Sequence, residues 1–332
     1  MAGDAITQIV RDVISRFPDA PARSIARRVA AESNGAITLE QARSRVRTIL
    51  GTNGKVHRKR VGSKLFRAPR EAGVAYEMPR SVARSWDPYR FEVTGRVGIL
   101  SDAHIPFHDE AALGAAVAHL KRSGISGLLL NGDWADFYAV SRHEKNPKDR
   151  DFRGELKAVR ESLQWLRQEF PEIPIAYKLG NHEERWGRWL IQHAVEISDE
   201  PEMGLDVWLK TERSGITIVE DQRIILLGEL PVLHGHELPR GLASPVNPAR
   251  GAFLRTHHTV LVGHSHQTSG HCDTDLFHRE TFVWSAGCLC NLTPEYARVN
   301  RWNHGAAIVE VHDDGQFDVS NLRIANGVVR SS

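Results

Sequence analysis

The sequence has little cysteine and no long apolar run. Its 332 residues include three cysteines, at positions 272, 288 and 290, and none of them forms a Cys-x-x-Cys pair. This argues against a disulfide framework and favours a reduced, cytoplasmic protein with structural thiols. No apolar stretch approaches the roughly 18 residues that a membrane span needs, and the N-terminus lacks the apolar segment of a signal peptide. We therefore expect an intracellular chain that binds no membrane.

The sequence also has little net charge, because its positive and negative residues almost balance, but they are unevenly distributed along the chain. The net charge is +2, yet residues 1–70 contain 15 Lys and Arg against 5 Asp and Glu, whereas residues 71–332 contain 28 against 36. A basic N-terminal region, here called the head (residues 1–70), followed by an acidic remainder suggests that the head binds a polyanion, such as DNA or another nucleic acid. The length is sufficient for one or two domains.

Residues 1–60 have the pattern of three short helices. Apolar residues at helical spacing run from Ile6 to Ile14, Pro21 opens a second segment, and Thr38 with Gln41 forms a capping box for a third. This outline indicates a helix-turn-helix whose third helix and exit are cationic. The candidate nucleic-acid contacts are Arg43, Arg47, Lys55, Arg58, Lys59 and Arg60. The alternative is a small helical bundle with a solvated cationic face. Phosphate contacts are favoured because no base-reading signature is present.

Residues 61–94 predict a linker, because prolines at 69, 79 and 88 interrupt them and no apolar period persists. Residues 95–325 then alternate between strands and helices before turning to strands alone. We expect helices at 109–122 and 152–170. The expected strands are 97–100, 128–130, 175–179, 216–219, 224–227, 232–233, 260–262, 282–284, 307–311 and 317–319. This order predicts an α/β domain of two packed sheets with helices outside.

Five short polar clusters each follow a predicted strand. They are Asp102-Ala-His104, Gly132-Asp133, Gly180-Asn181-His182-Glu183, His234-Gly235-His236 and Gly263-His264-Ser265-His266. Open α/β sheets place their sites at such strand ends, so the clusters should meet. Their carboxylates, amide and imidazoles suit Mn, Fe, Ni or Zn more than Ca. Asp133 is the natural bridge between two cations, which would activate a water for attack on phosphorus.

Each cluster by itself has an ordinary explanation. A lone Asp-x-His is usually part of a solvated loop, and a lone His-x-His is usually a pair on one strand face. Five clusters in order, each at a strand end, argue against coincidence. Glycines at 132, 180, 235 and 263 permit the tight turns that aim ligands inward.

This order of motifs resembles that of the calcineurin-like metallophosphoesterase superfamily over about residues 96–325. Leu-Asn-Gly-Asp133, Gly-Asn-His-Glu-Glu-Arg-Trp186 and Trp302-Asn-His-Gly305 also resemble a phage-type or prophage-type group with a helical head. The resemblance implies a four-layer αββα sandwich, here with a small all-α, helix-turn-helix-like N-terminal domain. It implies two divalent metal ions, with Mn favoured and Fe, Ni, Zn or Mg as alternatives. The implied ligands are Asp102, His104, Asp133 and His266 for one ion, and Asp133, Asn181, His234 and His264 for the other.

The resemblance also implies roles for neighbouring residues. His182 would protonate the leaving oxygen or steady the transition state, which makes it a catalytic residue together with Asp133. Glu183 is expected to orient His182. The sequence itself, rather than the resemblance, suggests roles for two more residues. Asp136 follows Asp133 by three and would order water near the site or cap a helix. Arg185 would hold a phosphate oxygen or pair with a surface carboxylate.

Spacing alone leaves open whether His234 or His236 is the metal ligand. His234 is chosen because it stands directly at the predicted strand end and matches the position in the superfamily.

The superfamily includes phosphomonoesterases, phosphodiesterases and nucleases, so the fold leaves the substrate open. Residues 132–137 lack the arginine of the Gly-Asp-x-Val-Asp-Arg-Gly motif of Ser/Thr phosphoprotein phosphatases, although Arg185 echoes those enzymes. Together with the basic head, this favours a phosphodiesterase that acts as a DNA nuclease. The alternatives are a phosphomonoesterase or small cyclic-nucleotide phosphodiesterase, and a nucleic-acid-binding protein whose metal site is little used. Any partner protein would be a separate chain, since no ATPase or long coiled-coil signature is present.

Overall fold

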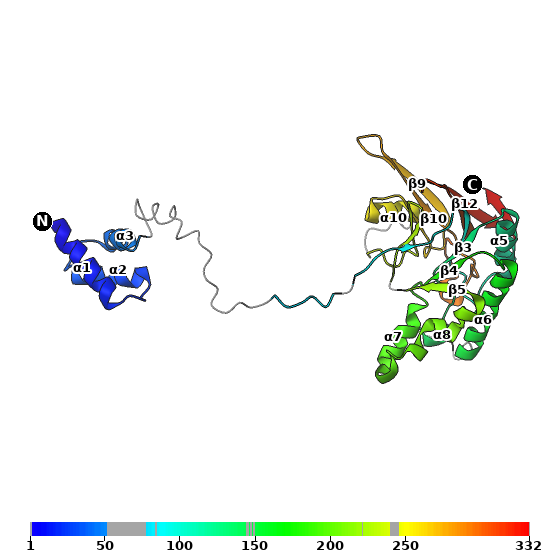
Figure 1. The fold of residues 1–332 in the computed structure, drawn as a ribbon, viewed down its shortest axis with the longest axis horizontal. Helices are drawn as coiled ribbons and strands as arrows, with labels where there is room; N and C mark the ends of the chain where they lie inside the picture. Colours follow the sequence, from blue (N-terminus) through cyan, green and yellow to red (C-terminus); the bar gives the residue numbers. More distant parts are fainter. Residues whose placement is uncertain are drawn as a thin grey trace. The chain divides into compact units, whose positions relative to one another are not determined.

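The computed structural model describes residues 2–51, 78–83, 85–143, 146, 148, 150–220, 222–239 and 246–331. The chain divides into two compact units, Met1–Ala83 and Arg84–Ser332 (Figure 1). In the described ranges, no helix is both long and apolar enough to cross a membrane.

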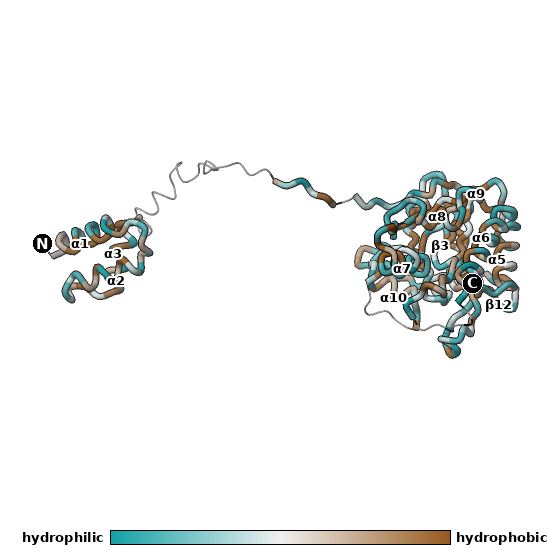
Figure 2. Tube along the Cα trace, turned by 90° about the horizontal axis from the view of Figure 1, so that it is seen from below, coloured by the Kyte–Doolittle hydropathy of each residue, from teal (hydrophilic) through white to brown (hydrophobic). Residues whose placement is uncertain are grey.

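The first unit contains three helices. They are α1 (Ala2–Arg16), α2 (Ala22–Glu32) and α3 (Leu39–Ile49). Figure 2 shows apolar and polar positions mixed along each of them, as expected of amphipathic helices. Their apolar faces meet in a small core that includes Val13, Val29 and Val46. The capping box of Thr38 and Gln41 begins α3, as the sequence predicts. Lys55, Arg58, Lys59 and Arg60 lie outside the described residues.

The second unit contains two sheets. The seven-stranded sheet has the order β13-β12-β11-β2-β3-β4-β5, and the six-stranded sheet has the order β1-β6-β7-β8-β10-β9. The strands of the first are β2 (Gly95–Leu100), β3 (Gly127–Asn131), β4 (Ile175–Lys178), β5 (Ile216–Val219), β11 (His304–Val311), β12 (Phe317–Ala325) and β13 (Val328–Ser331). Those of the second are β1 (Tyr89–Arg90), β6 (Ile225–Leu227), β7 (Leu230–Leu233), β8 (Val260–Val262), β9 (Ser269–Thr274) and β10 (Glu280–Ser285).

Three apolar cores hold four layers together. Between the sheets, residues such as Val97 and Leu129 face Leu227 and Leu261. The outer face of the seven-stranded sheet is buried under the helices α5 (Glu110–Arg122), α6 (Phe152–Glu169) and α7 (Glu184–His193). The short helices α8 (Leu205–Leu209) and α9 (Thr211–Ser214) join that layer. The outer face of the six-stranded sheet is covered by α10 (Pro248–Thr256). The αββα sandwich implied by the resemblance is therefore confirmed.

Some elements differ from the sequence-based expectation. Tyr89–Arg90 falls in the predicted linker but pairs in parallel with β6, because the next residue, Phe91, is buried in the core between the sheets. Strand β9 and helix α10 were not expected. Strand β9 is mostly exposed and lacks an apolar run, so no strand is predicted for it from its residues alone. Strand β13 extends the fold beyond residue 325.

Candidate metal centre

The five polar clusters converge where the two sheets end. Strands β2, β3 and β4 are parallel neighbours, so their carboxyl ends bring Asp102, Asp133 and Asn181 to one edge. Strands β7 and β8 are parallel in the other sheet and deliver His234 and His264. The loops are tied together by backbone bonds, since the N–H of residue 102 donates to the carbonyl of residue 132 at 3.1 Å, and that of residue 263 to the carbonyl of residue 234 at 2.8 Å.

The backbone at the centre is strained. Five of the expected ligands have φ in the left-handed region: Asp102 (55°), His104 (52°), Asp133 (50°), His264 (64°) and His266 (54°). Such a conformation costs a residue with a side chain of order 1–3 kcal/mol, and it persists only where the surroundings enforce it. Strain of this kind concentrates at functional sites, which agrees with a site that aims several side chains at one point.

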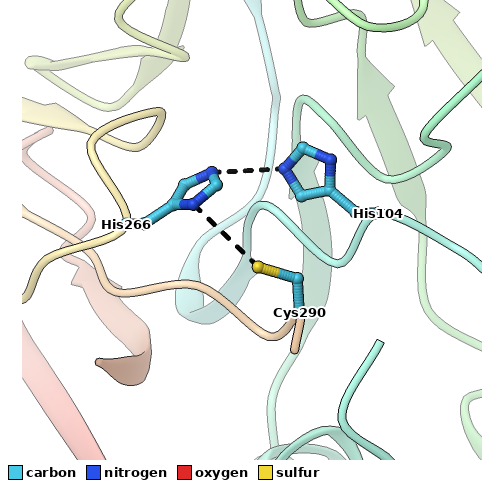
Figure 3. A group of neighbouring side chains, drawn as sticks. All are labelled: His104, His266 and Cys290. Atoms are coloured by element: carbon cyan, nitrogen blue, oxygen red, sulfur yellow. Dashed lines mark hydrogen bonds between the residues drawn. The ribbon is translucent and has the colours of Figure 1, made fainter. Parts of the chain in front are cut away.

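One group of donors is formed by His104, His266 and Cys290, which point toward one another in Figure 3. The Nε2 atoms of the two histidines lie 3.2 Å apart, and His266 Nε2 is also 3.1 Å from Asp102 Oδ1. Asp136 Oδ2 lies 3.0 Å from His104 Nδ1, so this nitrogen carries the proton and Nε2 is left with its lone pair. The Sγ of Cys290 lies 3.9 Å from His266 Nδ1.

A second group is formed by Asp133, His234 and His264. His234 Nε2 lies 3.3 Å from Asp133 Oδ2, and His234 Nδ1 donates to the carbonyl of Asn131 at 2.7 Å. A carbonyl only accepts, so the tautomer of His234 is fixed with Nε2 free to bind. Asp133 also belongs to a group with His104 and His182. Its carboxylate is thus common to the group with His104 and His182 and the group with His234 and His264.

Several potential metal-ligand atoms of this centre are buried without a hydrogen-bond partner among the described residues. Within the described part of the chain these include Asn181 Oδ1, His234 Nε2 and Asp102 Oδ1, whose neighbour His266 lies outside hydrogen-bonding geometry. A buried polar atom left unsatisfied costs about 1–3 kcal/mol. Divalent cations would satisfy all three atoms, so the residues present fit a metal pair.

His182 stands at the rim of the centre between Asp136 and Arg185. Its Nδ1 donates to the Asp136 carbonyl at 2.9 Å, while Arg185 Nη2 lies 2.8 Å from its Nε2. Burial lowers the pKa of His182, but the carboxylates of Asp133 and Asp136 outweigh burial and leave this pKa raised. Nε2 is also 3.8 Å from Asp133 Oδ2. The ring, the guanidinium and the shared carboxylate therefore face a common space.

Glu183 acts on the backbone of the site. Its buried carboxylate accepts N–H groups from Asp133 (3.0 Å), Ala135 (2.8 Å) and Gly180 (2.7 Å), and also the hydroxyl of Tyr177 (2.6 Å). It thereby fixes the loops after β3 and β4. The orientation of the His182 ring was assigned to Glu183 in the sequence analysis. The ring is held instead by the hydrogen bond that its Nδ1 donates to the Asp136 carbonyl and by the contact of its Nε2 with Arg185.

Glu237 holds the turn after β7 in place, as Glu183 holds the loops after β3 and β4. Glu237 accepts the N–H of His234 (3.2 Å) and of Gly235 (2.6 Å), and forms an ion pair of 2.7 Å with the fully buried Lys178. His236 points elsewhere, because its Nε2 lies 2.9 Å from Glu184. The geometry therefore favours His234 over His236 as the ligand.

The sequence reading missed several residues that shape the centre. Cys290, which the sequence analysis interpreted as a structural thiol, belongs to a group of possible metal ligands with His104 and His266. Lys178 has no motif around it in the sequence. Glu155 of α6 is buried, and its carboxylate accepts the N–H of Ala139 at 3.3 Å. The sequence signal for Glu155 was a carboxylate on the otherwise apolar face of an amphipathic helix. Among the other expected residues, Trp186 stacks on Phe152 in the core, whereas Arg43 pairs with Glu40 in the helical unit.

Comparisons with known proteins come from sequence and from structure. No family model matches the chain. The "Gene 54 protein" of Mycobacterium phage L5 is 26% identical over 234 residues, covering 67% of this chain and 90% of that relative.

Similar solved structures include nuclease MPE from Pseudomonas putida, with 14% identity, 71% of this chain, 87% of that chain and a TM-score of 0.32. A dimetal phosphatase from Danio rerio has 11% identity over 72% of this chain and 98% of its own, with a TM-score of 0.36. Vacuolar Protein Sorting 29 from Cryptosporidium parvum has 12% identity over 72% of this chain and 95% of its own, with a TM-score of 0.38.

In its motif order and its four-layer fold, the chain resembles the calcineurin-like metallophosphoesterases.

Proposed function

We propose that the chain is a dinuclear-metal phosphoesterase that hydrolyses phosphodiester bonds, with DNA as its substrate. The observation that carries this proposal is the place of Asp133 in two groups of possible ligands, one with His104 and His182 and one with His234 and His264. Beside them lie buried atoms without a hydrogen-bond partner among the described residues. One cation would be held by Asp102, His104, Asp133 and His266. The other would be held by Asp133, Asn181, His234 and His264. Manganese suits this mixture of carboxylate, imidazole and amide.

Two divalent cations, when bound, supply Lewis-acid activation of a water and of a phosphoryl oxygen. The protein contributes donors for the rest of the phosphate. Arg185 and a protonated His182 would both donate toward an anionic oxygen placed between them, and 2.8 Å now separates their nitrogens. From that position His182 would pass its Nε2 proton to the leaving oxygen. Asp136 would hold His182 and His104 in place, since it contacts both rings.

The nucleic-acid part of the proposal is supported by the charge of the N-terminal region. Residues 1–60 are proposed to form a nucleic-acid-binding domain, with residues 95–325 as the catalytic domain. Arg43 and Arg47 lie on α3, and the remaining cationic candidates follow that helix in the sequence. Phosphate contacts of this kind raise affinity without selecting a sequence, and they weaken as salt increases.

A substrate panel tests the proposal. The full chain with Mn should hydrolyse bis-p-nitrophenyl phosphate and DNA, which is offered both as plasmid and as a single strand. Asp133→Asn should lower both rates by about 100-fold or more, whereas Asp318→Asn, whose side chain is exposed on β12, should change neither. His182→Asn should lower kcat by about 100-fold or more at unchanged metal content. Hydrolysis of p-nitrophenyl phosphate alone would contradict the diesterase proposal and support the phosphomonoesterase alternative.

A further inference from the structure

Two cavities of contrasting character flank the candidate metal centre. One, of about 710 Å³, opens beside His104, Asp136 and Cys290. The other, of about 810 Å³, opens beside Asn181 and His264. A substrate whose scissile phosphate reached the centre would therefore extend into both.

The cavity beside His104 has aromatic walls. Phe107 and Tyr138 meet edge to face, with ring centroids 5.8 Å apart, and Tyr296 and Pro294 line the same space. The rings are available to a ligand, because Phe107 is 39% exposed and Tyr296 is 69% exposed. Exposed aromatic rings in a cavity are suited to stack against a flat, apolar group such as a nucleobase.

The cavity beside His264 is cationic. Among the described residues, five arginines line it, Arg142, Arg150, Arg185, Arg188 and Arg255, together with one carboxylate, Glu184. That carboxylate is already engaged, since it lies 2.9 Å from His236 Nε2 and 3.4 Å from Arg188. The arginines come from the loop after η2 (Tyr138–Val140), from α7 and from α10, so they surround the space rather than line one helix face. Guanidinium groups bind phosphate oxygens through paired hydrogen bonds.

We propose that this cleft binds one single strand of nucleic acid across the metal centre. A base would lie against Phe107 and Tyr296, and the neighbouring phosphates would lie among Arg142, Arg150 and Arg255. This inference rests on the proposed function and names the form of its substrate. A free phosphate or an inorganic polyphosphate would use the arginines but leave the aromatic cavity without a ligand. A duplex would keep its bases stacked inside, where the aromatic rings could not reach them.

The arginine half of the cleft is tested with charge-neutral variants of the full chain. Arg142→Gln combined with Arg150→Gln should lower kcat/KM for a single-stranded oligodeoxynucleotide by about 100-fold, or roughly 10-fold for each charged hydrogen bond removed. The slope of log(kcat/KM) against log[salt] should also fall, by about 1 for each phosphate that the variant no longer binds. Hydrolysis of bis-p-nitrophenyl phosphate should not change. Arg122→Gln, on the outer face of α5, is the matched control and should leave all three values as they are.

The aromatic half of the cleft is tested with two substrates, an oligonucleotide that carries bases and one of the same length that carries none. Tyr296→Ala and Phe107→Ala should each lower kcat/KM on oligothymidylate by about 5- to 100-fold, the range expected when one base loses the ring on which it stacks. On an oligonucleotide of the same length whose sugars carry no bases, the two variants should match the wild type. The conservative variants Tyr296→Phe and Phe107→Tyr should recover the rate on oligothymidylate.

The outcomes separate this inference from the proposed function. If the wild-type protein with Mn hydrolyses neither the small diester nor any DNA, the proposed function fails. If it hydrolyses both, but the arginine and aromatic variants cut the single strand as fast as the wild type, only the cleft assignment is overturned. A wild-type preference for the duplex form of the same sequence would also overturn it.

Discussion

The ion pair between Lys178 and Glu237 should decide the stability of the catalytic unit. Lys178 is fully buried at the end of β4, and its Nζ lies 2.7 Å from the Glu237 carboxylate. Burial raises the pKa of Glu237, but Lys178, His236 and His234 outweigh burial and lower this pKa from 4.5 to about 2. A fall of that size corresponds to about 3 kcal/mol of folding stability.

The sign of this contribution follows from the direction of the shift. A carboxyl group with a lowered pKa stabilises the folded state at pH values above its unfolded pKa of 4.5. That stability is lost as the pH falls from 4.5 toward 2. Removing one partner of a buried pair leaves an uncompensated charge and costs about 3–5 kcal/mol, which agrees with the value from the pKa.

We therefore expect Lys178→Met to lower the free energy of unfolding by about 3–5 kcal/mol at pH 7. The difference from the wild type should shrink as the pH falls from 4.5 toward 2. The double variant Lys178→Met/Glu237→Gln should recover much of the loss, because it removes the unpaired carboxylate. The control is Lys157→Met, which breaks an exposed pair with Glu161 and should cost less than about 1 kcal/mol.

Denaturation by guanidinium chloride, followed by tryptophan fluorescence, is the measurement. All eight tryptophans stand at or after position 86, so the signal reports on the second unit. The reasoning is refuted if Lys178→Met costs no more than Lys157→Met, or if the double variant is less stable than Lys178→Met alone.

Two further predictions concern packing and pH. A Cβ at Gly180 would lie 2.3 Å from Asp133 Oδ1 and 2.5 Å from its backbone nitrogen, so Gly180→Ala should displace that carboxylate and weaken Mn binding by about 10-fold or more. Calorimetric titration measures this, and Gly187→Ala in α7, where a Cβ has open space, should bind Mn normally. Burial and the nearby charge of Asp136 raise the pKa of Glu155 from 4.5 to about 7. A carboxyl group with a raised pKa makes the stability of the wild type fall as the pH rises from 4.5 to 7. Glutamine does not titrate, so the free energy of unfolding of Glu155→Gln minus that of the wild type should be up to about 3 kcal/mol larger at pH 8 than at pH 4.5. An equal effect at both pH values would contradict this assignment.

The fold was largely predictable because its buried strands and helices have strong apolar patterns. Strand β3 is buried at every position, and α6 presents one apolar stripe, so each was recognised from periodicity. Strand β9 and helix α10 were missed because β9 is mostly exposed and α10 has little amphipathic contrast in its sequence. Tyr89–Arg90 has no pattern of its own and becomes a strand only through its pairing with β6.

The expected metal ligands could be named because each directly follows a strand. The residues that hold these ligands in place could not be named from the sequence, because their contacts join residues that lie far apart along the chain. Glu237 reaches Lys178 across 59 positions of the chain, and no local spacing encodes that pair. The left-handed backbone conformation of Asp102 and Asp133 could not be predicted from the sequence either, because the surrounding loops impose it and neither position is a glycine.

Metal stoichiometry tests the central claim most directly. The full chain, stripped with chelator and titrated with Mn in a calorimeter, should bind two equivalents, and elemental analysis after desalting should agree. Asp133→Asn should weaken both binding events together, because Asp133 Oδ2 lies 3.9 Å from His104 Nε2, at one proposed ion, and 3.3 Å from His234 Nε2, at the other. A wild-type protein that binds no Mn, or an Asp133→Asn variant that binds two equivalents as tightly as the wild type, would contradict the account.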